Sequence, residues 1–354
     1  KSPAGEKLED DLLRVKEPRR FTYLEFFKRH TCYDLLPSSV KLVIVDTELS
    51  IQKAFLALVF NNVRASILWN SNTQNFVGML TITDFIKVLV NDYGKHFGQL
   101  DDYENSTVAK WRNIDKSTEN QPLICVAPET NLYDAAKTLI KHRYHRLPII
   151  DLEYGNPLYI LTHKRILNYL YLNRNILPQD TFMSKSLEEL RLGTYVPNVY
   201  AVSKEAPIID ALRLLVKHQV SCLPVVDSEN HLVELYAKFD AFNLAVTRTY
   251  HDLDATIYSA LAFHRENRDR YPRPMTCHRT TTLRCVIERI VNSGIHRLVI
   301  VDSKHKLEGV ISLSDILRFI VQYKADENKN TENRLRVPTN ALPVTYGLKN
   351  RNQK

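Results

Sequence analysis

The sequence contains four copies of one pattern, and this repetition restricts its fold more than any other feature. Each copy passes from a short polar or basic group into an apolar run, at residues 61–69, 142–151, 218–227 and 293–302. Turn residues follow, and then a second apolar run and a polar motif that opens a helix-like stretch. Apolar runs of this length, bounded by turn residues, predict buried strands. The order helix, strand, turn, strand, helix predicts an α/β (α+β) fold made of tandem repeats.

The spacing within the copies is almost constant, which indicates a common structure. Each basic or polar residue at the start of the first apolar run is followed 19 or 20 positions later by the last residue of the polar motif. The pairs are Arg64 and Asp84, His145 and Arg165, Ser221 and Asp240, and His296 and Asp315. A further strand and helix start lies upstream of each copy, and we interpret the polar stretches between copies as linkers.

Composition narrows the classes of function. The 48 Lys and Arg against 40 Asp and Glu give a net charge of +8, which suggests an anionic partner. Basic residues are spread through apolar patterns rather than gathered in a block, so a small phosphate ligand is favoured at least as much as nucleic acid. The five cysteines are an odd number without a C-x-x-C pair, which predicts reduced thiols, no metal site, and a cytoplasmic and nuclear location.

Membrane insertion and catalysis are both disfavoured. No apolar run approaches the roughly 18 residues that a membrane-spanning helix needs. The glycine-rich phosphate loops, the H-E-x-x-H metal motif and the G-x-S-x-G nucleophile motif are missing from the sequence. With only 9 glycines, a bound nucleotide must be held by side chains rather than by a backbone loop. We therefore predict no catalytic residues, no catalytic cofactor and no metal.

Longer strings carry a resemblance to a known family. They include FFKRHTCYDLLPSSVKLVIVDTELSIQKAF at 26–55, HRLPIIDLEYGNPLYILTHKRIL at 145–167 and FMSKSLEELRLGTY at 182–195. Over about residues 21 to 323 the chain resembles the gamma regulatory subunits of AMP-activated protein kinase, which consist of cystathionine-β-synthase (CBS) domains. The resemblance implies four tandem CBS domains that form two Bateman modules packed as a flat disk.

The resemblance also implies a division of the chain. It places the CBS repeats at 37–98, 118–180, 192–251 and 270–323, which we number 1 to 4, after a pre-CBS segment at 21–36. The segments 1–20 and 324–354 lack apolar periodicity, and we expect them to be mobile.

Three aspartates are implied as ribose ligands. In the family, the last residue of an [ST]-x-x-D motif accepts hydrogen bonds from ribose hydroxyls, which here indicates Asp84, Asp240 and Asp315. Repeat 3 begins its motif with Ala237 and so lacks the hydroxyl, while Arg165 replaces the carboxylate in repeat 2 and marks a site expected to stay empty. Three occupied sites are therefore implied. The alternative role for these aspartates is helix capping, and both roles can coexist.

The basic residues supply the phosphate side of the predicted sites. Arginine and other cations form strong, charge-assisted hydrogen bonds with phosphate oxygens. Packed histidines and solvated lysines are the alternative interpretations. The resemblance implies phosphate binding by Arg64, His145, Arg146, Lys164, His296 and Arg297. Further nucleotide contacts are implied for Thr81, Thr83, Thr194, Ser221, Lys238, Phe239, Ser312 and Ser314.

The function implied is that of a non-catalytic, energy-sensing regulatory subunit. AMP, ADP and ATP would compete for its sites and control a catalytic alpha subunit, with a scaffold beta subunit as the third partner and with neither nucleic acid nor membrane as partners. Two alternatives stay open. One is a stand-alone CBS regulator of adenine nucleotides or S-adenosylmethionine, and the other is a structural interaction protein with vestigial sites.

Overall fold

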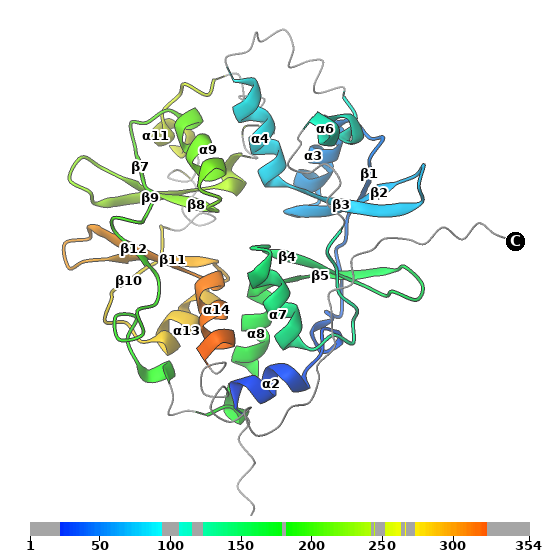
Figure 1. Cartoon of the computed structure of the whole chain (residues 1–354). Helices are drawn as coiled ribbons and strands as arrows, with labels where there is room; N and C mark the ends of the chain where they lie inside the picture. Colours follow the sequence, from blue (N-terminus) through cyan, green and yellow to red (C-terminus); the bar gives the residue numbers. More distant parts are fainter. Residues whose placement is uncertain are drawn as a thin grey trace, which may run out of the picture.

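The computed structural model describes residues 22–93, 106–114, 123–178, 182–241, 244, 252–262, 266 and 273–323. The two terminal segments expected to be mobile, 1–20 and 324–354, lie outside this part of the chain. Figure 1 shows four lobes of helices and strands around a common centre, and each lobe corresponds to one repeat.

Each repeat combines a hairpin with flanking helices. Repeat 1 consists of β1 (Ile44–Asp46), α3 (Ile51–Phe60), β2 (Ala65–Asn70), β3 (Asn75–Thr81) and α4 (Ile82–Asp92). Repeat 2 consists of α7 (Leu132–Lys141), β4 (Arg146–Ile150), β5 (Pro157–Thr162) and α8 (His163–Leu172). Repeat 3 consists of β7 (Val202–Ser203), α9 (Ile208–Lys217), β8 (Cys222–Val226), β9 (Leu232–Ala237) and η5 (Lys238–Asp240). Repeat 4 consists of β10 (Thr276–Cys277), α13 (Leu283–Asn292), β11 (Arg297–Val301), β12 (Leu307–Ser312) and α14 (Leu313–Tyr323).

The first strand of each hairpin (β2, β4, β8 and β11) is buried on both faces. In β2, Ile67 and Leu68 are both 0% exposed, although they point to opposite sides of the strand. Ile67 packs with Ile150 and Cys125 of repeat 2, whereas Leu68 belongs to the helical core of repeats 1 and 3. Sheet therefore packs on sheet between repeats 1 and 2. The apolar contacts of Leu232 with Val299 join repeats 3 and 4 in the same way.

Helices join the two sheet-paired modules. The helix α4 of repeat 1 packs on α9 of repeat 3, and α8 of repeat 2 packs on α13 and α14 of repeat 4. The two helical cores lie in the upper and lower halves of Figure 1, with the sheets between them. This arrangement places the ends of all four hairpins near the centre of the molecule.

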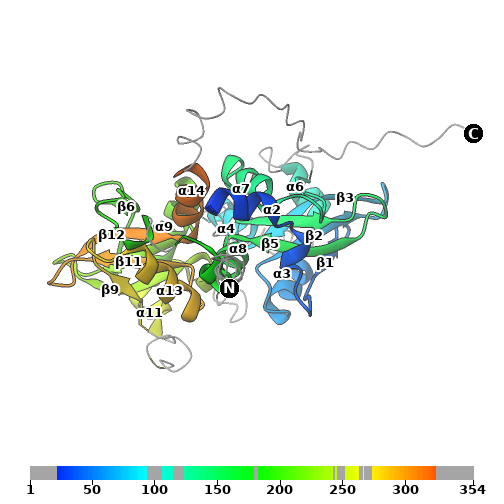
Figure 2. The same cartoon turned by 90° about the horizontal axis from the view of Figure 1, so that it is seen from below.

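Short segments that precede the repeats are exchanged within each module. We call 31–36, 107–112, 186–191 and 256–261 the leaders. Each leader forms a backbone bridge with the residue that caps the first helix of the other repeat in its module. The bridges join Thr31 to Asn131, Thr107 to Ser50, Ser186 to Thr282 and Thr256 to Pro207. Figure 2 shows the N-terminal helix α2 (Tyr23–Arg29) beside α7 of repeat 2.

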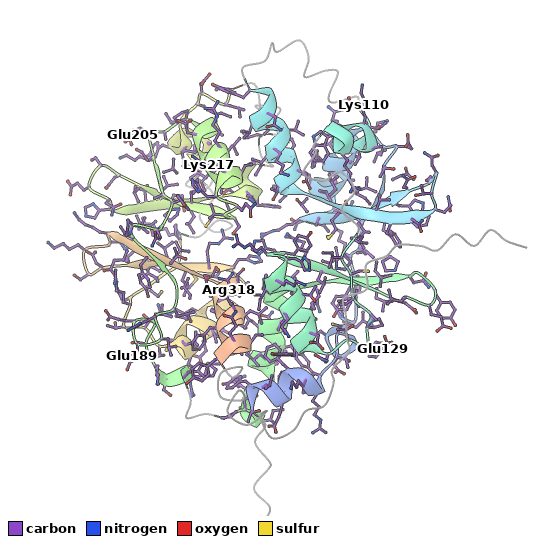
Figure 3. All side chains as sticks on the ribbon, in the orientation of Figure 1. Lys110, Glu129, Glu189, Glu205, Lys217 and Arg318 are labelled. Atoms are coloured by element: carbon purple, nitrogen blue, oxygen red, sulfur yellow. The ribbon has the colours of Figure 1, made fainter. Side chains whose placement is uncertain are left out.

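The leaders correct the interpretation of the inter-repeat stretches as polar linkers. Val108 and Trp111 are buried in a short helix, α6 (Val108–Ile114), and Val108 is 0% exposed. Leu187, in the leader 186–191, is also 0% exposed. Figure 3 shows the charged leader residues Lys110 and Glu189 at the outer margins of two lobes. A leader thus buries one or two apolar residues and exposes most of its charges, which is too short a pattern to be recognised as a helix in sequence.

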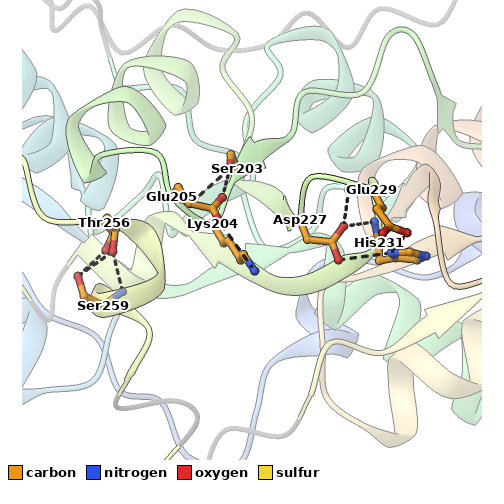
Figure 4. Close-up of polar contacts among 8 residues, drawn as sticks. All are labelled: Ser203, Lys204, Glu205, Asp227, Glu229, His231, Thr256 and Ser259. Carbon is orange, nitrogen blue, oxygen red and sulfur yellow. Dashed lines mark hydrogen bonds and ion pairs between the residues drawn. The ribbon is translucent and has the colours of Figure 1, made fainter.

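Side-chain oxygens fix the turns and the leaders. In Figure 4 the Asp227 carboxylate accepts hydrogen bonds from the backbone N–H groups of Glu229 and His231, both at 2.9 Å. In the leader that precedes repeat 4 and packs on repeat 3, the Thr256 hydroxyl accepts a hydrogen bond from the backbone N–H of Ser259 at 3.2 Å. Such bonds stabilise tight turns and helix starts. Among the described residues, none of the helices is long and apolar enough to cross a membrane.

Candidate functional site

A cavity of about 520 Å³ lies where the four repeats meet. Every repeat contributes polar or basic side chains to its wall. They include Arg64, Thr81 and Thr83 from repeat 1, His145, Arg146, His163 and Lys164 from repeat 2, Ser221, Lys238, Phe239 and Asp240 from repeat 3, and His296, Arg297, Ser312 and Ser314 from repeat 4. The structure therefore brings together all six residues predicted to bind phosphate.

The hairpin register explains the constant spacing found in the sequence. In repeat 4, Arg297 at the start of β11 pairs with Ser312 at the end of β12, and in repeat 2 Arg146 pairs with Thr162. An antiparallel hairpin places the start of one strand opposite the end of the next. The basic group and the polar motif, about 20 residues apart in sequence, are consequently neighbours in space.

The wall of the cavity carries many more cations than anions. Arg64, Arg146 and Arg297 line it together with Lys164 and Lys238, while its acidic residues are Asp240 and Glu234. Burial, reinforced by nearby cations, lowers the pKa of Arg146 to about 10, and burial lowers that of Lys238 to about 8. An excess of like charge in a confined space favours binding of a multivalent anion.

The histidines of the cavity are neutral near pH 7. Burial is the largest cause, and repulsion by neighbouring cations adds to it, so that the pKa of His145 falls to about 4 and that of His296 to about 3. The pKa of His163 also falls to about 3, and its ring centre lies 5.5 Å from that of His145. An arriving phosphate would reverse these shifts, because an anion favours the protonated imidazole.

The basic side chains contact neutral groups of other repeats. Arg64 Nη1 lies 3.1 Å from His296 Nε2, and Arg297 Nη2 donates to Ser221 Oγ at 2.9 Å. Lys238 Nζ donates to Thr83 Oγ1 at 3.0 Å, and Lys164 Nζ donates to the carbonyl of Gly294 at 2.7 Å. These contacts cross from one repeat to another, so a ligand that engages one of these side chains alters a contact between repeats.

The three aspartates lie at the N-termini of the helices that follow the hairpins. Oδ2 of Asp84 accepts from the backbone N–H and the hydroxyl of Thr81, at 2.7 and 2.9 Å. Asp315 Oδ2 makes the same two contacts with Ser312, at 2.9 and 2.6 Å. Asp240 Oδ2 accepts from the backbone N–H of Ala237 at 2.7 Å, and alanine has no hydroxyl for the second contact. Capping is thus present in all three, and it occupies Oδ2 of each carboxylate.

The predicted ligands do not all line the central cavity. Asp240 lines it, whereas Asp84 and Asp315 stand behind the motif residues that do. Thr194, a predicted nucleotide contact, lies apart from this cavity in the short strand β6 (Thr194–Tyr195), where it is exposed and pairs with Val310. Thr194 is separated from the basic cluster because β6 extends the outer edge of the repeat 4 sheet, and its role as a nucleotide contact stays a prediction.

Arg165 holds a leader in repeat 2. Its Nη1 donates to the backbone carbonyl of Leu35 at 3.0 Å, and its guanidinium lies 5.7 Å from the ring centre of Tyr159. The Tyr159 hydroxyl in turn donates to the carbonyl of Cys32 at 2.5 Å. Arg165, which stands where the other repeats have the motif aspartate, therefore binds the backbone of the leader 31–36.

Replacing Arg165 with alanine is expected to destabilise the protein by about 1–2 kcal/mol, because one charge-assisted hydrogen bond and one cation–π contact are lost. Urea unfolding would measure this change, with the exposed Arg191→Ala as the matched control. Equal midpoints for the two variants would show that Arg165 does not hold the leader.

Sequence reasoning missed His163 and Arg273. His163 is 5% exposed, lines the cavity, and follows Thr162 directly. The corresponding residue of repeat 3 is Lys238, so a comparison across repeats at this position was the signal that could have identified His163. Arg273 comes from the stretch before repeat 4, which has no repeated pattern that would have marked it.

Comparisons with known proteins agree with the repeated fold. The CBS domain family model matches residues 116–172, 192–242 and 271–322. The gamma-3 subunit of 5'-AMP-activated protein kinase from Homo sapiens is 43% identical over 312 residues, which cover 88% of this chain and 63% of that protein. The gamma-3 subunit from Bos taurus is 43% identical over 313 residues, covering 88% and 62%. The chain thus spans less than two thirds of the length of these relatives.

A solved structure shows the same fold over most of the chain. It is a protein of Methanocaldococcus jannaschii that was proposed to be an archaeal homologue of g-AMPK. The TM-score is 0.64 at 18% identity, and the match covers 82% of this chain and 99% of the archaeal chain. With the hairpin repeats, the basic cavity and the sequence identity taken together, the chain contains CBS domains and is similar over most of its length to the gamma subunits of 5'-AMP-activated protein kinase.

Proposed function

We propose that this chain is a non-catalytic regulatory subunit that senses adenine nucleotides for a protein kinase. AMP, ADP and ATP compete for sites whose phosphate ends meet in the central cavity. The observation that carries the proposal is the convergence of four arginines and two lysines, drawn from four repeats, on one cavity. Each charge-assisted contact with a phosphate oxygen contributes about 1.5–3 kcal/mol, so several together support specific binding without a phosphate loop.

The ribose end of the nucleotide is assigned to Asp84, Asp240 and Asp315. One oxygen of each carboxylate caps a helix, and a carboxylate has further lone pairs that can accept from ribose hydroxyls. Asp240 lacks the threonine or serine hydroxyl that supports the other two. The site of repeat 3 is therefore the one in which the first motif residue offers the carboxylate no hydroxyl.

Control of the kinase follows from unequal affinities. A nucleotide shifts the catalytic alpha subunit between states only by the difference in its affinity for those states. Because Lys238 joins repeat 3 to repeat 1 and Arg64 joins repeat 1 to repeat 4, exchange of ATP for AMP changes contacts between repeats. The alpha subunit and a scaffold beta subunit are proposed as partners on the strength of the gamma-subunit homology.

Calorimetric titration with AMP and ATP tests the proposal. We expect saturable binding of both, and we expect Asp315→Ala to weaken AMP binding at one site by about 10- to 100-fold, since two hydrogen bonds to a charged group are lost. Asp315→Asn is the matched control for capping, because it keeps an oxygen that can accept from the Ser312 N–H while it loses the charge. It should retain stability yet bind AMP less tightly than the wild type.

The same titration separates the alternatives. S-adenosylmethionine carries a sulfonium cation, which the cationic cavity would repel. Saturable binding of that ligand with no response to AMP would overturn the proposal in favour of a different adenosyl regulator. A folded protein that binds neither ligand would support a structural interaction role.

A further inference from the structure

One register position of the hairpins holds glycine in two repeats and a large side chain in the other two. It is six residues before Asp84, Arg165, Asp240 and Asp315, on the second strand of each hairpin. The four occupants are Gly78, Tyr159, Glu234 and Gly309, paired with Leu68, Ile149, Val225 and Ile300. Because the strands share one register, these four positions face the same side of their sheets.

In repeat 1 this position admits the guanidinium of Arg112. A Cβ atom at Gly78 would lie 2.9 Å from Arg112 Nη2 and 3.1 Å from Nη1, so glycine leaves the space that the guanidinium fills. Arg112 belongs to α6, which continues the leader packed on repeat 1. The backbone N–H groups of Val108 and Ala109 donate to the carbonyls of Leu49 and Thr47, at 3.0 and 2.9 Å. The leader therefore holds Arg112 in place on the sheet.

At this position beside Gly78, Arg112 interacts electrostatically with Asp84, the carboxylate proposed to bind ribose in repeat 1. Asp84 is 9% exposed, and its charge interacts with that of Arg112. Burial lowers the pKa of Arg112, and the Asp84 carboxylate partly offsets that effect. Thr81 holds Asp84 Oδ2 through two hydrogen bonds, and the charge of the Arg112 guanidinium acts on the same carboxylate.

The other repeats fill the equivalent position differently. Tyr159 occupies it in repeat 2 and lies under Arg165. In repeat 4, a Cβ at Gly309 would lie 2.7 Å from the backbone oxygen of Thr194, so strand β6 closes the space there. Glu234 occupies it in repeat 3 and is 6% exposed. Within the described residues, the combination of glycine and a leader guanidinium is found in repeat 1.

We propose that Arg112 is a positioning residue for the repeat 1 site, where it orients the Asp84 carboxylate toward the ribose hydroxyls and sets the preference for ribonucleotides over deoxyribonucleotides. The inference deepens the proposed function and depends on it. A cation behind a carboxylate restricts its rotamers and keeps it ionised, which strengthens its hydrogen bonds to hydroxyl donors.

The experiment compares AMP with 2'-deoxy-AMP by calorimetry. It uses an Asp240→Ala, Asp315→Ala background, so that Asp84 is the remaining ribose carboxylate. We expect Arg112→Gln to reduce the preference for AMP by about 5- to 10-fold, because the charge is lost while much of the side chain's packing is kept. Arg112→Lys should restore part of the preference, and Gly78→Ala should reduce it by displacing the guanidinium.

Arg191 provides the matched control, since it stands at the same place in the leader on repeat 4 and is exposed. Arg191→Gln should leave the preference unchanged. A merely structural role for Arg112 would weaken the binding of AMP and of 2'-deoxy-AMP equally and keep the ratio of their affinities, which would overturn the inference.

Asp84→Ala tests the proposed function separately. If Asp84→Ala abolishes the preference and Arg112→Gln does not, the ribose assignment stands and the positioning role is wrong. If Asp84→Ala also keeps the preference, both are wrong.

Discussion

AMP binding by the His145→Asp variant is expected to be at least about 100-fold weaker than that of the wild type. The substitution removes one donor and places a negative charge in the cavity where the phosphate is expected to lie, next to Arg146 and within reach of Ser314, whose Oγ is 3.5 Å from His145 Nδ1. Repulsion between like charges and loss of a hydrogen bond to a charged group both act against binding. Arg64→Gln removes one cation without adding an anion, and its expected effect is about 10- to 100-fold.

Calorimetry or competition with a fluorescent nucleotide would measure these effects. His142→Asp is the control, because His142 caps the end of α7 and lies outside the cavity wall. We expect it to bind AMP like the wild type. Unchanged titration curves for both His145→Asp and Arg64→Gln in folded samples would contradict a phosphate site in the central cavity.

Nucleotide binding is expected to take up protons and to tighten as the pH falls from about 8 to 6.5. In the empty cavity the three histidines have pKa values of about 4, 3 and 3. A bound phosphate favours the imidazolium form and raises these values toward or above the ordinary value near 6.5. Affinity then rises by up to about tenfold per pH unit for each proton taken up.

The groups that set these pKa values come from all four repeats. His145 faces Arg146, Lys238 and Arg297; His163 faces His145, Arg146 and Arg318; and His296 faces Arg64, Arg297, Lys164 and Arg146. Titration of AMP in buffers of different ionisation enthalpy would give the number of protons bound. A binding enthalpy that is independent of the buffer between pH 6.5 and 8 would exclude this linkage.

The stability of the empty protein should have the opposite dependence on pH. The depressed pKa of buried His163 means that the unfolded chain binds more protons than the folded chain between about pH 6.5 and 3. The free energy of unfolding therefore falls in this window as the pH is lowered, by about 1.4 kcal/mol per pH unit for each such histidine. Saturation with AMP should reduce this loss, because the ligand favours the protonated form.

Much of the fold follows from local sequence. The inner strands were predicted from apolar runs, and the structure has them as β2, β4, β8 and β11. The tandem CBS architecture is likewise confirmed by the family model and by the archaeal structure. These features could be predicted because strand burial and turn formation depend on the types of consecutive residues. Of the six basic residues expected at a common site, five lie at the start of the first hairpin strand of their repeats, whereas Lys164 follows the second strand of its hairpin.

Other features depend on contacts between segments far apart in sequence. The leaders are too short to show periodicity, and their exchange between repeats becomes evident only when Thr107 is seen paired with Ser50. The interaction of Arg112 with Asp84 has the same origin, since it requires a glycine on β3 and a helix from the stretch before repeat 2. The place of Thr194, which the resemblance implied as a nucleotide contact, likewise depends on the distant pairing of its short strand with β12 at the edge of a sheet.

The sequence by itself determined the four hairpin repeats and the chemistry of their conserved positions within the chain: a cation at the start of one strand and an acid or hydroxyl at the end of the next. Both depend on residues no more than about 20 positions apart, within reach of a single antiparallel hairpin. Only the tertiary structure decided that the polar ends of the four hairpins face one cavity, that Arg165 binds the backbone of a leader, and that the charge of Arg112 interacts with Asp84. The reason is that sheet-on-sheet and helix-on-helix packing between repeats, rather than any local propensity, sets which charges are brought close enough to interact.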